Sequence, residues 1–373
     1  MNTKRLTLLA GLFLALAAWL VVEPALAQVR TPAPSPYAKV SEEVGLTDIT
    51  IKYNRPGVKG RQIWGDGNLV PNGLSTPFPG FGSGNAFPWR AGANENTTIS
   101  FEHDVLVEGQ KLAAGHYGLH MIPSDADWTI IFSENTTSWG SFFYDEAEDA
   151  LRVTVTPEEV PHKERLAYEF MDHDGQGGVT IALVWEKKKV PFRVQVDDYH
   201  DVVIASMRGE LRSRGGFGWQ GYAQAANYAQ QNGVHLEEAL GWAEMAVTRN
   251  KAFNTLQVKA SVLAKMGDVD GGIAVMDEAI PLSTENQLNA YGYQLMGLNK
   301  MEDALRVFKI NVERHPDAWN PHDSLAECYA NMGDTKNARK FYKKALDMLP
   351  EGDQTNYDRI TKTLADLDAQ GSN

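Results

Sequence analysis

Side chains that could bind a ligand gather in one short stretch of the sequence, Trp89-Arg-Ala-Gly-Ala-Asn-Glu95. The stretch places a guanidinium, an amide and a carboxylate beside very small residues. Gly92 can hold a positive φ, and residues of this size let another backbone approach closely. Guanidinium groups bind carboxylates, phosphates and sugars through a planar fork of donors, so this stretch and two arginines before it form a candidate ligand site. Its residues are Arg55, Arg61, Arg90, Asn94 and Glu95.

The same stretch also has a structural interpretation. Arg90 and Glu95 could form an ion pair that ties the preceding Gly/Pro-rich loop, Asn72 to Pro88, to a sheet. Ion pairs of this kind occur in structural networks as well as in functional sites. The sequence therefore favours a structural pair over a ligand site. A loop of this length without periodicity is either a lid, a binding loop or an insertion.

Three histidines, His103, His116 and His120, are candidate ligands of a metal ion. The segment that holds His116 and His120 is predicted as a strand, in which four residues span about 13 Å. Two imidazoles that far apart cannot share an ion whose bonds are about 2 Å long. Asp172 and Asp174 resemble a calcium loop, but the later acidic ligand is missing and a hairpin turn explains them. We predict no metal and no cofactor.

Catalytic motifs are missing from the sequence. It contains no Gly-x-Ser-x-Gly, no His-Glu-x-x-His and no phosphate-binding loop, so we predict no catalytic residues and favour a protein that is not an enzyme. Its nine tryptophans include Trp64, Trp89 and Trp139 near predicted loops. These could stack against a sugar, although core packing is the expected role of most of them.

The composition limits the classes of partner. A net charge of −13 over 373 residues argues against nucleic acid and anionic membrane surfaces, since both require basic patches. Cys328 is the only cysteine, so the chain forms no intramolecular disulfide and its domains depend on core burial.

The first residues have the pattern of a secretory signal peptide. Lys4 and Arg5 precede an apolar run, Leu6 to Val22, and Ala25-Leu26-Ala27 fits the cleavage rule. An uncleaved anchor is the alternative, because an apolar run of 17 residues is close to spanning length. We favour cleavage between Ala27 and Gln28, which makes the protein periplasmic or secreted, with no membrane span in the mature chain.

Two kinds of periodicity divide the remaining chain. After a Pro-rich linker at 28–36, short alternating segments run from Tyr37 to Val196, for example Ile49-Thr-Ile-Lys-Tyr53, and they predict an antiparallel β-sandwich. From about Asp197 the spacing becomes helical. A repeat is visible because the three residues Ala304, Phe308 and Pro316 recur, each 34 residues later, as Ala338, Tyr342 and Pro350. This is the period of tetratricopeptide units, of which four copies are expected, with departures at Gly272 and Asn311.

Several phrases of the β region resemble a bacterial family of exported proteins known as domain of unknown function 2911. They are Tyr53-Asn-Arg-Pro, Val58-Lys-Gly-Arg61, Trp89-Arg-Ala-Gly-Ala-Asn-Glu95, Ala114-Gly-His-Tyr117, Trp128-Thr-Ile-Ile-Phe132 and Val184-Trp-Glu-Lys187. The resemblance implies a β-sandwich in an exported protein and no particular activity. The helical region resembles tetratricopeptide arrays, which implies a groove that binds a protein or peptide.

The sequence thus predicts a signal peptide at 1–27, a linker at 28–36, a β-sandwich at 37–197 and tetratricopeptide-like repeats at 198–373. We expect an exported, non-catalytic binding or assembly protein whose helical repeats engage a protein or peptide. The alternative is an enzyme or a protein that binds a small anionic or sugar ligand at the Arg90–Glu95 stretch.

The signal peptide yields the first prediction. Protein purified from the cell envelope should begin at Gln28, because Ala25 and Ala27 occupy the small-residue positions of a cleavage site. Intact-mass measurement checks the new N-terminus. A full-length species retained in the membrane would instead identify the segment as an anchor.

Overall fold

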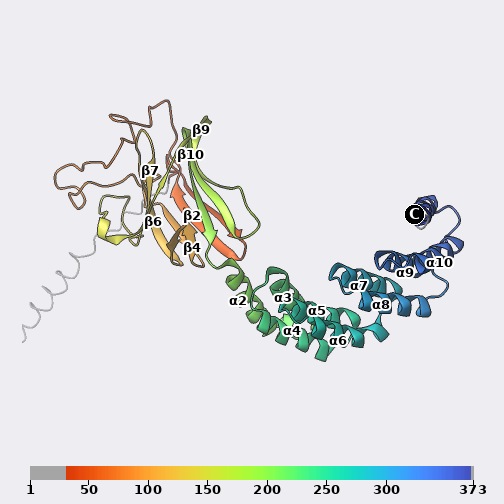
Figure 1. Ribbon diagram of the computed structural model, residues 1–373. Helices are drawn as coiled ribbons and strands as arrows, with labels where there is room; N and C mark the ends of the chain where they lie inside the picture. The colour runs from red at the N-terminus through yellow and green to blue at the C-terminus, as the bar shows by residue number, and fades with distance from the viewer. Residues whose placement is uncertain (1–30, 371–373) are drawn as a thin grey trace, which may run out of the picture. The chain divides into compact units, whose positions relative to one another are not determined.

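The computed structural model describes residues 31–370, which form two compact units that divide after Tyr199 (Figure 1). The predicted signal peptide and its cleavage site at Ala27 and Gln28 lie outside the described residues. No helix among residues 31–370 is long and apolar enough to span a bilayer.

The first unit consists of two antiparallel sheets. The larger has six strands in the spatial order β1 (Tyr37–Val44), β2 (Thr47–Asn54), β3 (Thr98–Phe101), β6 (Gly115–Ile122), β7 (Trp128–Ser133) and β8 (Asp149–Val155). The smaller has four, in the order β5 (Gln110–Leu112), β4 (Val105–Val107), β10 (Gly178–Val196) and β9 (Glu158–Met171). The predicted sandwich of antiparallel strands is confirmed.

Alternating side chains explain why these segments pair as sheets. In β2, Ile49 and Ile51 are fully buried whereas Lys52 is exposed. Side chains from the two sheets meet in one core, where the ring of Phe132 in β7 lies edge-on to that of Phe192 in β10, with centroids 6.0 Å apart. Burying an aromatic or aliphatic side chain contributes about 1.5–3 kcal/mol, so this shared core stabilises both sheets.

The strands differ from the prediction at the end of the unit. Alternation in the sequence predicts two strands, Ile181 to Trp185 and Val190 to Val196, but β10 runs through both. Its pairing with β9 shifts register on both sides of Glu186, which has a φ of +54°. Such bulges let a strand bend without ending. The predicted hairpin turn before β10 is present, because Asp174 accepts hydrogen bonds from the backbone of Gln176 and Gly178.

The second unit is entirely helical. It begins with α2 (Tyr199–Leu211) and ends with α11 (Gln354–Gln370). Four helix pairs lie between them: α3 (Trp219–Asn232) with α4 (Leu236–Arg249), α5 (Phe253–Lys265) with α6 (Val269–Ala279), α7 (Glu285–Gly297) with α8 (Met301–Arg314), and α9 (Trp319–Asn331) with α10 (Thr335–Asp347). Single 3₁₀ turns are found at Glu146–Glu148, Arg214–Gly216 and Ile280–Leu282.

The repeated residues make the contacts between helices. Ala304 and Ala338 are fully buried, as is Phe308 in the space between α7 and α8. The two departures from the pattern have local explanations. A Cβ atom at Gly272 would lie 2.9 Å from the carbonyl oxygen of Ala260, so α5 and α6 are too close there for alanine. Asn311 is fully buried, and its amide donates a hydrogen bond to the carbonyl of Glu285.

Candidate functional site

The backbone between Arg90 and Glu95 has an unusual conformation. Ala91 and Asn94 have φ values of +48° and +60°, whereas Gly92, where the sequence suggests a positive φ, has an ordinary one. Gly92 is required for another reason. A Cβ atom there would lie 2.6 Å from the hydroxyl of Thr97 and 3.4 Å from the carbonyl oxygen of Asn54, so the predicted close approach of another backbone is present.

Hydrogen bonds hold this strained segment in place. The hydroxyl of Tyr168 in β9 donates to the carbonyl of Ala91 over 2.9 Å, and the amide of Asn94 donates to the carbonyl of Ser35 over 3.3 Å. A non-glycine residue in the left-handed region costs about 1–3 kcal/mol, and such residues cluster at functional sites. The conformation therefore marks the segment as a candidate site independently of its side chains.

Arg90 is fixed by aromatic rings and by a carbonyl group. Its guanidinium carbon lies 4.6 Å from the ring centroid of Phe142 and 5.6 Å from that of Trp139, and one of its nitrogens donates to the carbonyl of Asn94. Gly140 makes room for it, since a Cβ atom there would collide with the guanidinium. Burial lowers the pKa of Arg90, and the nearby charge of Glu95 opposes this shift.

The predicted ion pair between Arg90 and Glu95 is wrong. No ion pair joins the two residues in the described part of the chain, and the side chain of Glu95 is exposed. The physical reason is that Phe142, Trp139 and the Asn94 carbonyl already occupy the surroundings of the guanidinium.

A pocket of about 370 Å³ opens beside this segment. The side chains that give it its chemical character are Arg61, Arg90, Asn94, Trp89, Trp139 and Trp185. We call it the arginine–tryptophan pocket. Three of the five predicted site residues, Arg61, Arg90 and Asn94, therefore come together, whereas Arg55 and Glu95 are not among the lining residues. Arg55 instead donates from Nε to the carbonyl of Leu166 over 2.8 Å.

Tryptophan rings form one wall of the pocket. Trp89 stacks on Trp185 with centroids 6.0 Å apart, and Trp64 contacts both edge-on. Trp139, in contrast, is 51% exposed. Within residues 31–370, the buried indole nitrogens of Trp185 and Trp64 have no hydrogen-bond partner. Sequence reasoning did not single out Trp185, because its alternating strand context is that of an ordinary core residue.

The three histidines lie in separate environments. His120 in β6 is almost completely buried, with Nδ1 3.0 Å from the hydroxyl of Ser141, while Nδ1 of His103 is 3.1 Å from the hydroxyl of Thr47. Across residues 31–370, no group of three His, Cys, Asp or Glu side chains is placed to hold a metal ion. Burial, followed by the charge of Arg90, lowers the pKa of His120 to about 4.

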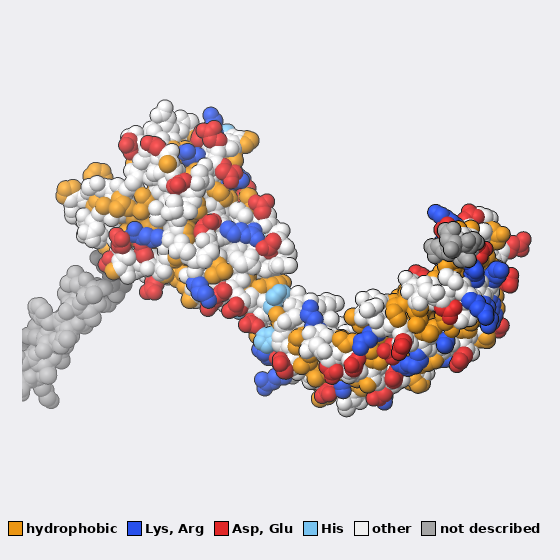
Figure 2. Space-filling view, viewed as in Figure 1, with side chains coloured by type: hydrophobic (Ala, Val, Ile, Leu, Met, Phe, Trp, Pro, Cys, Tyr) orange, Lys and Arg blue, Asp and Glu red, His pale blue; other side chains and the backbone are white. Residues whose placement is uncertain are grey.

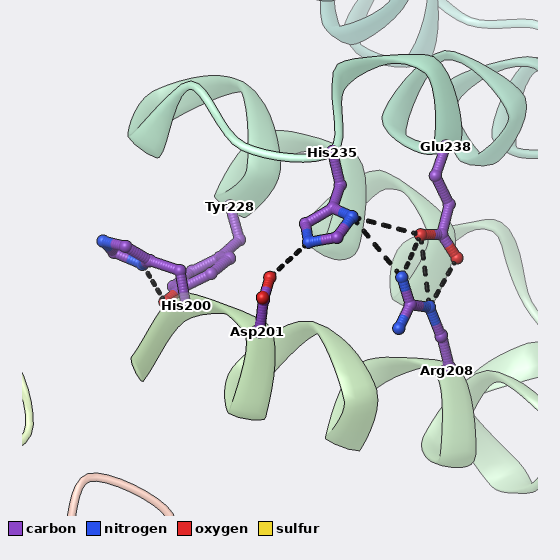
Figure 3. Close-up of polar contacts among 6 residues, drawn as sticks. All are labelled: His200, Asp201, Arg208, Tyr228, His235 and Glu238. Carbon is purple, nitrogen blue, oxygen red and sulfur yellow. Dashed lines mark hydrogen bonds and ion pairs between the residues drawn. The ribbon is translucent and has the colours of Figure 1, made fainter. Parts of the chain in front are cut away.

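A second polar cluster, which the sequence did not reveal, lies at the start of the helical unit (Figure 3). Nε2 of His235 is 2.5 Å from a carboxylate oxygen of Asp201, and Arg208 donates two hydrogen bonds to Glu238 over 2.9 and 2.7 Å. These contacts join α2 to the first turn of α4. Because the side chains satisfy one another, the cluster holds α2 against the first helix pair and is not an open ligand site.

Two segments of the chain match known families. Residues 35–194 match the family described as Protein of unknown function (DUF2911), and residues 322–351 match the tetratricopeptide repeat. The two resemblances stated from the sequence are thereby confirmed. No curated protein matches the sequence significantly.

Solved structures resemble part of the chain. The crystal structure of MamA is 15% identical over 40% of this chain and 87% of that chain, with a TM-score of 0.31. YrrB, described as a TPR protein with an unusual peptide-binding site, is 18% identical over 43% of this chain and 83% of that one, with a TM-score of 0.31. A thermophilic TPR protein from Thermus thermophilus, TTC0263, is 18% identical over 45% and 91%, with a TM-score of 0.30. Similarity at this level says nothing about function.

The surroundings of Arg90 lead to a prediction for a double-mutant cycle. Because its guanidinium lies over the Phe142 ring, the coupling between Arg90→Ala and Phe142→Leu should be about 1 kcal/mol in the free energy of unfolding. The coupling between Arg90→Ala and Glu95→Ala should be below about 0.5 kcal/mol, as for solvent-exposed charges. Urea unfolding of the single and double variants measures both. A larger coupling of Arg90 with Glu95 than with Phe142 would instead support the ion pair that the sequence suggested.

Because His120 is buried, we expect the free energy of unfolding to depend on pH. Its pKa is lower in the folded protein than in the unfolded chain, so the unfolded state takes up the proton first as the pH falls. Stability should therefore be lost between about pH 6.5 and pH 4, by up to about 3 kcal/mol. Urea unfolding across this range should show a shallower loss in His120→Gln.

The matched control for this effect is His116→Gln. His116 lies in the same strand but is exposed, so its pKa is lowered by a weaker burial effect. Replacing it should remove a smaller part of the pH dependence. Identical pH profiles for His120→Gln and the unchanged protein would show that His120 is not held neutral by burial.

Proposed function

We propose that the protein is exported and that its helical repeats bind a protein or peptide partner without catalysing a reaction. A role in protein interaction follows from the tetratricopeptide match and the four stacked helix pairs. Such arrays form extended binding surfaces from the small rotation between successive pairs. In Figure 1 the first helices of the pairs, α3, α5, α7 and α9, line the inner side of the helical unit.

A row of amide side chains carries this proposal. The second residue of each first helix is asparagine or glutamine, and all four are exposed or half-exposed. They are Gln220, Asn254, Asn286 and Asn320. An amide both donates and accepts hydrogen bonds, as a peptide backbone does. Repetition at equivalent positions therefore suits an extended chain, whose peptide groups also recur at regular intervals.

Two further rows continue the same helix faces, because residues three and seven positions later lie on the same side of a helix. The row three positions later consists of Ala223, Gln257, Asn289 and Asp323. The row seven positions later consists of half-buried polar residues, Asn227, Ser261, Tyr293 and Glu327. Hydrogen bonds link successive first helices at this surface: Gln287 of α7 donates to Asn254 of α5 over 3.1 Å, and Tyr293 of α7 donates to Glu327 of α9 over 2.7 Å. Apart from the buried Ala223, the three rows are polar, and these two hydrogen bonds orient Asn254, Tyr293 and Glu327.

The charge of this surface limits the partner. None of the residues in the three rows is lysine or arginine. Of their two carboxylates, Asp323 is buried and ion-paired with Arg359 over 2.7 Å, whereas Glu327 accepts a hydrogen bond from Tyr293. Figure 2 shows charged side chains of both signs interspersed over the visible face of the helical unit. These features favour a neutral or basic peptide over an acidic one.

Export and the absence of catalysis rest on different observations. The export proposal rests on the sequence of residues 1–27 alone. The alternative function, an enzyme or an anion- or sugar-binding protein, concerns the arginine–tryptophan pocket. Of the described residues, no carboxylate and no imidazole lines that pocket. It therefore lacks the groups that general acid–base catalysis requires, and the pocket favours the binding form of the alternative.

The amide row is tested by replacing three of its members together. The mature protein should capture its partner from the native envelope, and Asn254→Ala/Asn286→Ala/Asn320→Ala should recover at least tenfold less. Each lost hydrogen bond contributes about 0.5–1.5 kcal/mol, so three are sufficient for this effect. Quantitative mass spectrometry of the captured material gives the measurement.

The control variant changes residues on the second helices of the pairs. Glu237, Glu302 and Lys343 are exposed residues of α4, α8 and α10, so Glu237→Ala/Glu302→Ala/Lys343→Ala changes as many side chains away from the row. This variant should capture the partner as well as the unchanged protein. Equal capture by all three proteins would contradict a binding role for the amide row.

A further inference from the structure

We infer that the arginine–tryptophan pocket binds an anionic sugar, with its acidic group at Arg61 and Arg90 and its ring against Trp139. This inference concerns the β-sheet unit and is independent of the peptide-binding proposal. It rests on the charges, the aromatic surface and the size of the pocket.

The first observation is an excess of positive charge. In the described part of the chain, neither Arg61 nor Arg90 has a carboxylate within ion-pair distance. Two other arginines of the same unit do have one: Arg152 is 2.6 Å from Asp149, and Arg193 is 2.5 Å from Asp174. Two guanidinium groups in one pocket with no carboxylate among its lining residues, in a protein with a net charge of −13, favour an anionic ligand.

The second observation is that both guanidinium groups are held in place. Arg61 donates from Nε to the carbonyl of Val58 over 3.1 Å and from Nη2 to that of Gly57 over 2.5 Å. Arg90 is fixed by Phe142 and by the Asn94 carbonyl. Each guanidinium has five N–H donors, so several remain for a ligand. Because these side chains are already ordered, binding does not incur the full entropic cost of immobilising them.

The third observation concerns the aromatic surface. Trp139 is 51% exposed although it lies beside Arg90, and Trp89 and Trp185 line the same pocket. The C–H groups on one face of a pyranose ring pack well on an indole.

The fourth observation is size. A volume of about 370 Å³ is near the lower end of the range of about 300–1,000 Å³ that is typical of small-molecule sites. Asn94, whose φ is +60°, is exposed and lines the pocket, and backbone strain of this kind clusters at ligand sites. The pocket therefore fits one or two sugar rings better than a polymer.

The test uses the mature full-length protein and four probes: glucuronate, glucose 6-phosphate, glucose and inorganic phosphate. Titration calorimetry at low ionic strength measures affinity, and tryptophan fluorescence reports on the indoles of the pocket. The two anionic sugars should bind saturably, and glucose and phosphate at least tenfold more weakly. Equal binding of glucose would overturn the role of the arginines, and equal binding of phosphate would overturn the role of the indole.

Single substitutions test whether glucuronate binds in the arginine–tryptophan pocket. Arg61→Gln should weaken glucuronate binding at least tenfold and Trp139→Ala at least fivefold. Both side chains are substantially exposed, so thermal melting should show that the variants remain folded. Lys111→Gln is the matched control, because it removes one positive charge from the same unit at a residue paired with Asp197 outside the pocket. Absence of saturable binding by both anionic sugars, or unchanged binding in Arg61→Gln, would overturn the inference.

Discussion

The carbonyl group of Ala91 is the acceptor on which the geometry of the β-sheet unit's pocket depends. It receives a hydrogen bond from Tyr168, whose hydroxyl comes from the opposite sheet. Burial raises the pKa of Tyr168 well above its ordinary value, so the hydroxyl keeps its proton and remains a donor. Together with the hydroxyl of Thr97, which donates to the same carbonyl over 3.4 Å, this contact holds Ala91 in its left-handed conformation. That conformation in turn directs Arg90 on one side and Asn94 on the other toward the pocket.

Different constraints govern the helical unit. Its core is built from residues that are small where two helices touch, such as Ala304 and Ala338, and aromatic where they diverge, such as Phe308 and Tyr342. Each pair buries apolar surface both between its own two helices and against the neighbouring pairs. The cluster of Asp201, His235, Arg208 and Glu238 closes one end of the array with polar contacts in place of another repeat.

The sequence predicts those features that depend on near neighbours along the chain. Alternation around Ile49 and Ile51 is sufficient to predict a strand, and the recurrence of Ala304 and Phe308 is sufficient to predict helix pairs. The surroundings of Arg90 could not be predicted in this way. They depend on Phe142, about fifty residues later, which reaches the guanidinium only because β6 and β7 bring the two segments together.

For the candidate site, three of the five residues named from the sequence line one pocket, and the expected pairing of Arg90 with Glu95 is absent among the described residues. A charged neighbour five positions away makes Glu95 the natural partner of Arg90, whereas an aromatic ring distant in the sequence is the actual one. Gly92 illustrates the same limit. Its small size is correctly linked to a close approach, but the positive φ falls on Ala91, because the hydrogen bond from Tyr168 determines which residue takes that conformation.

The polar links between successive first helices have a mechanical consequence. Gln287 to Asn254, and Tyr293 to Glu327, each connect one helix pair only to the next. A structure connected in this way can change its curvature by small rotations at every junction, without opening the apolar core of any pair. Small rotations of this kind add up along the array, so its curvature depends on every junction and not on a single hinge.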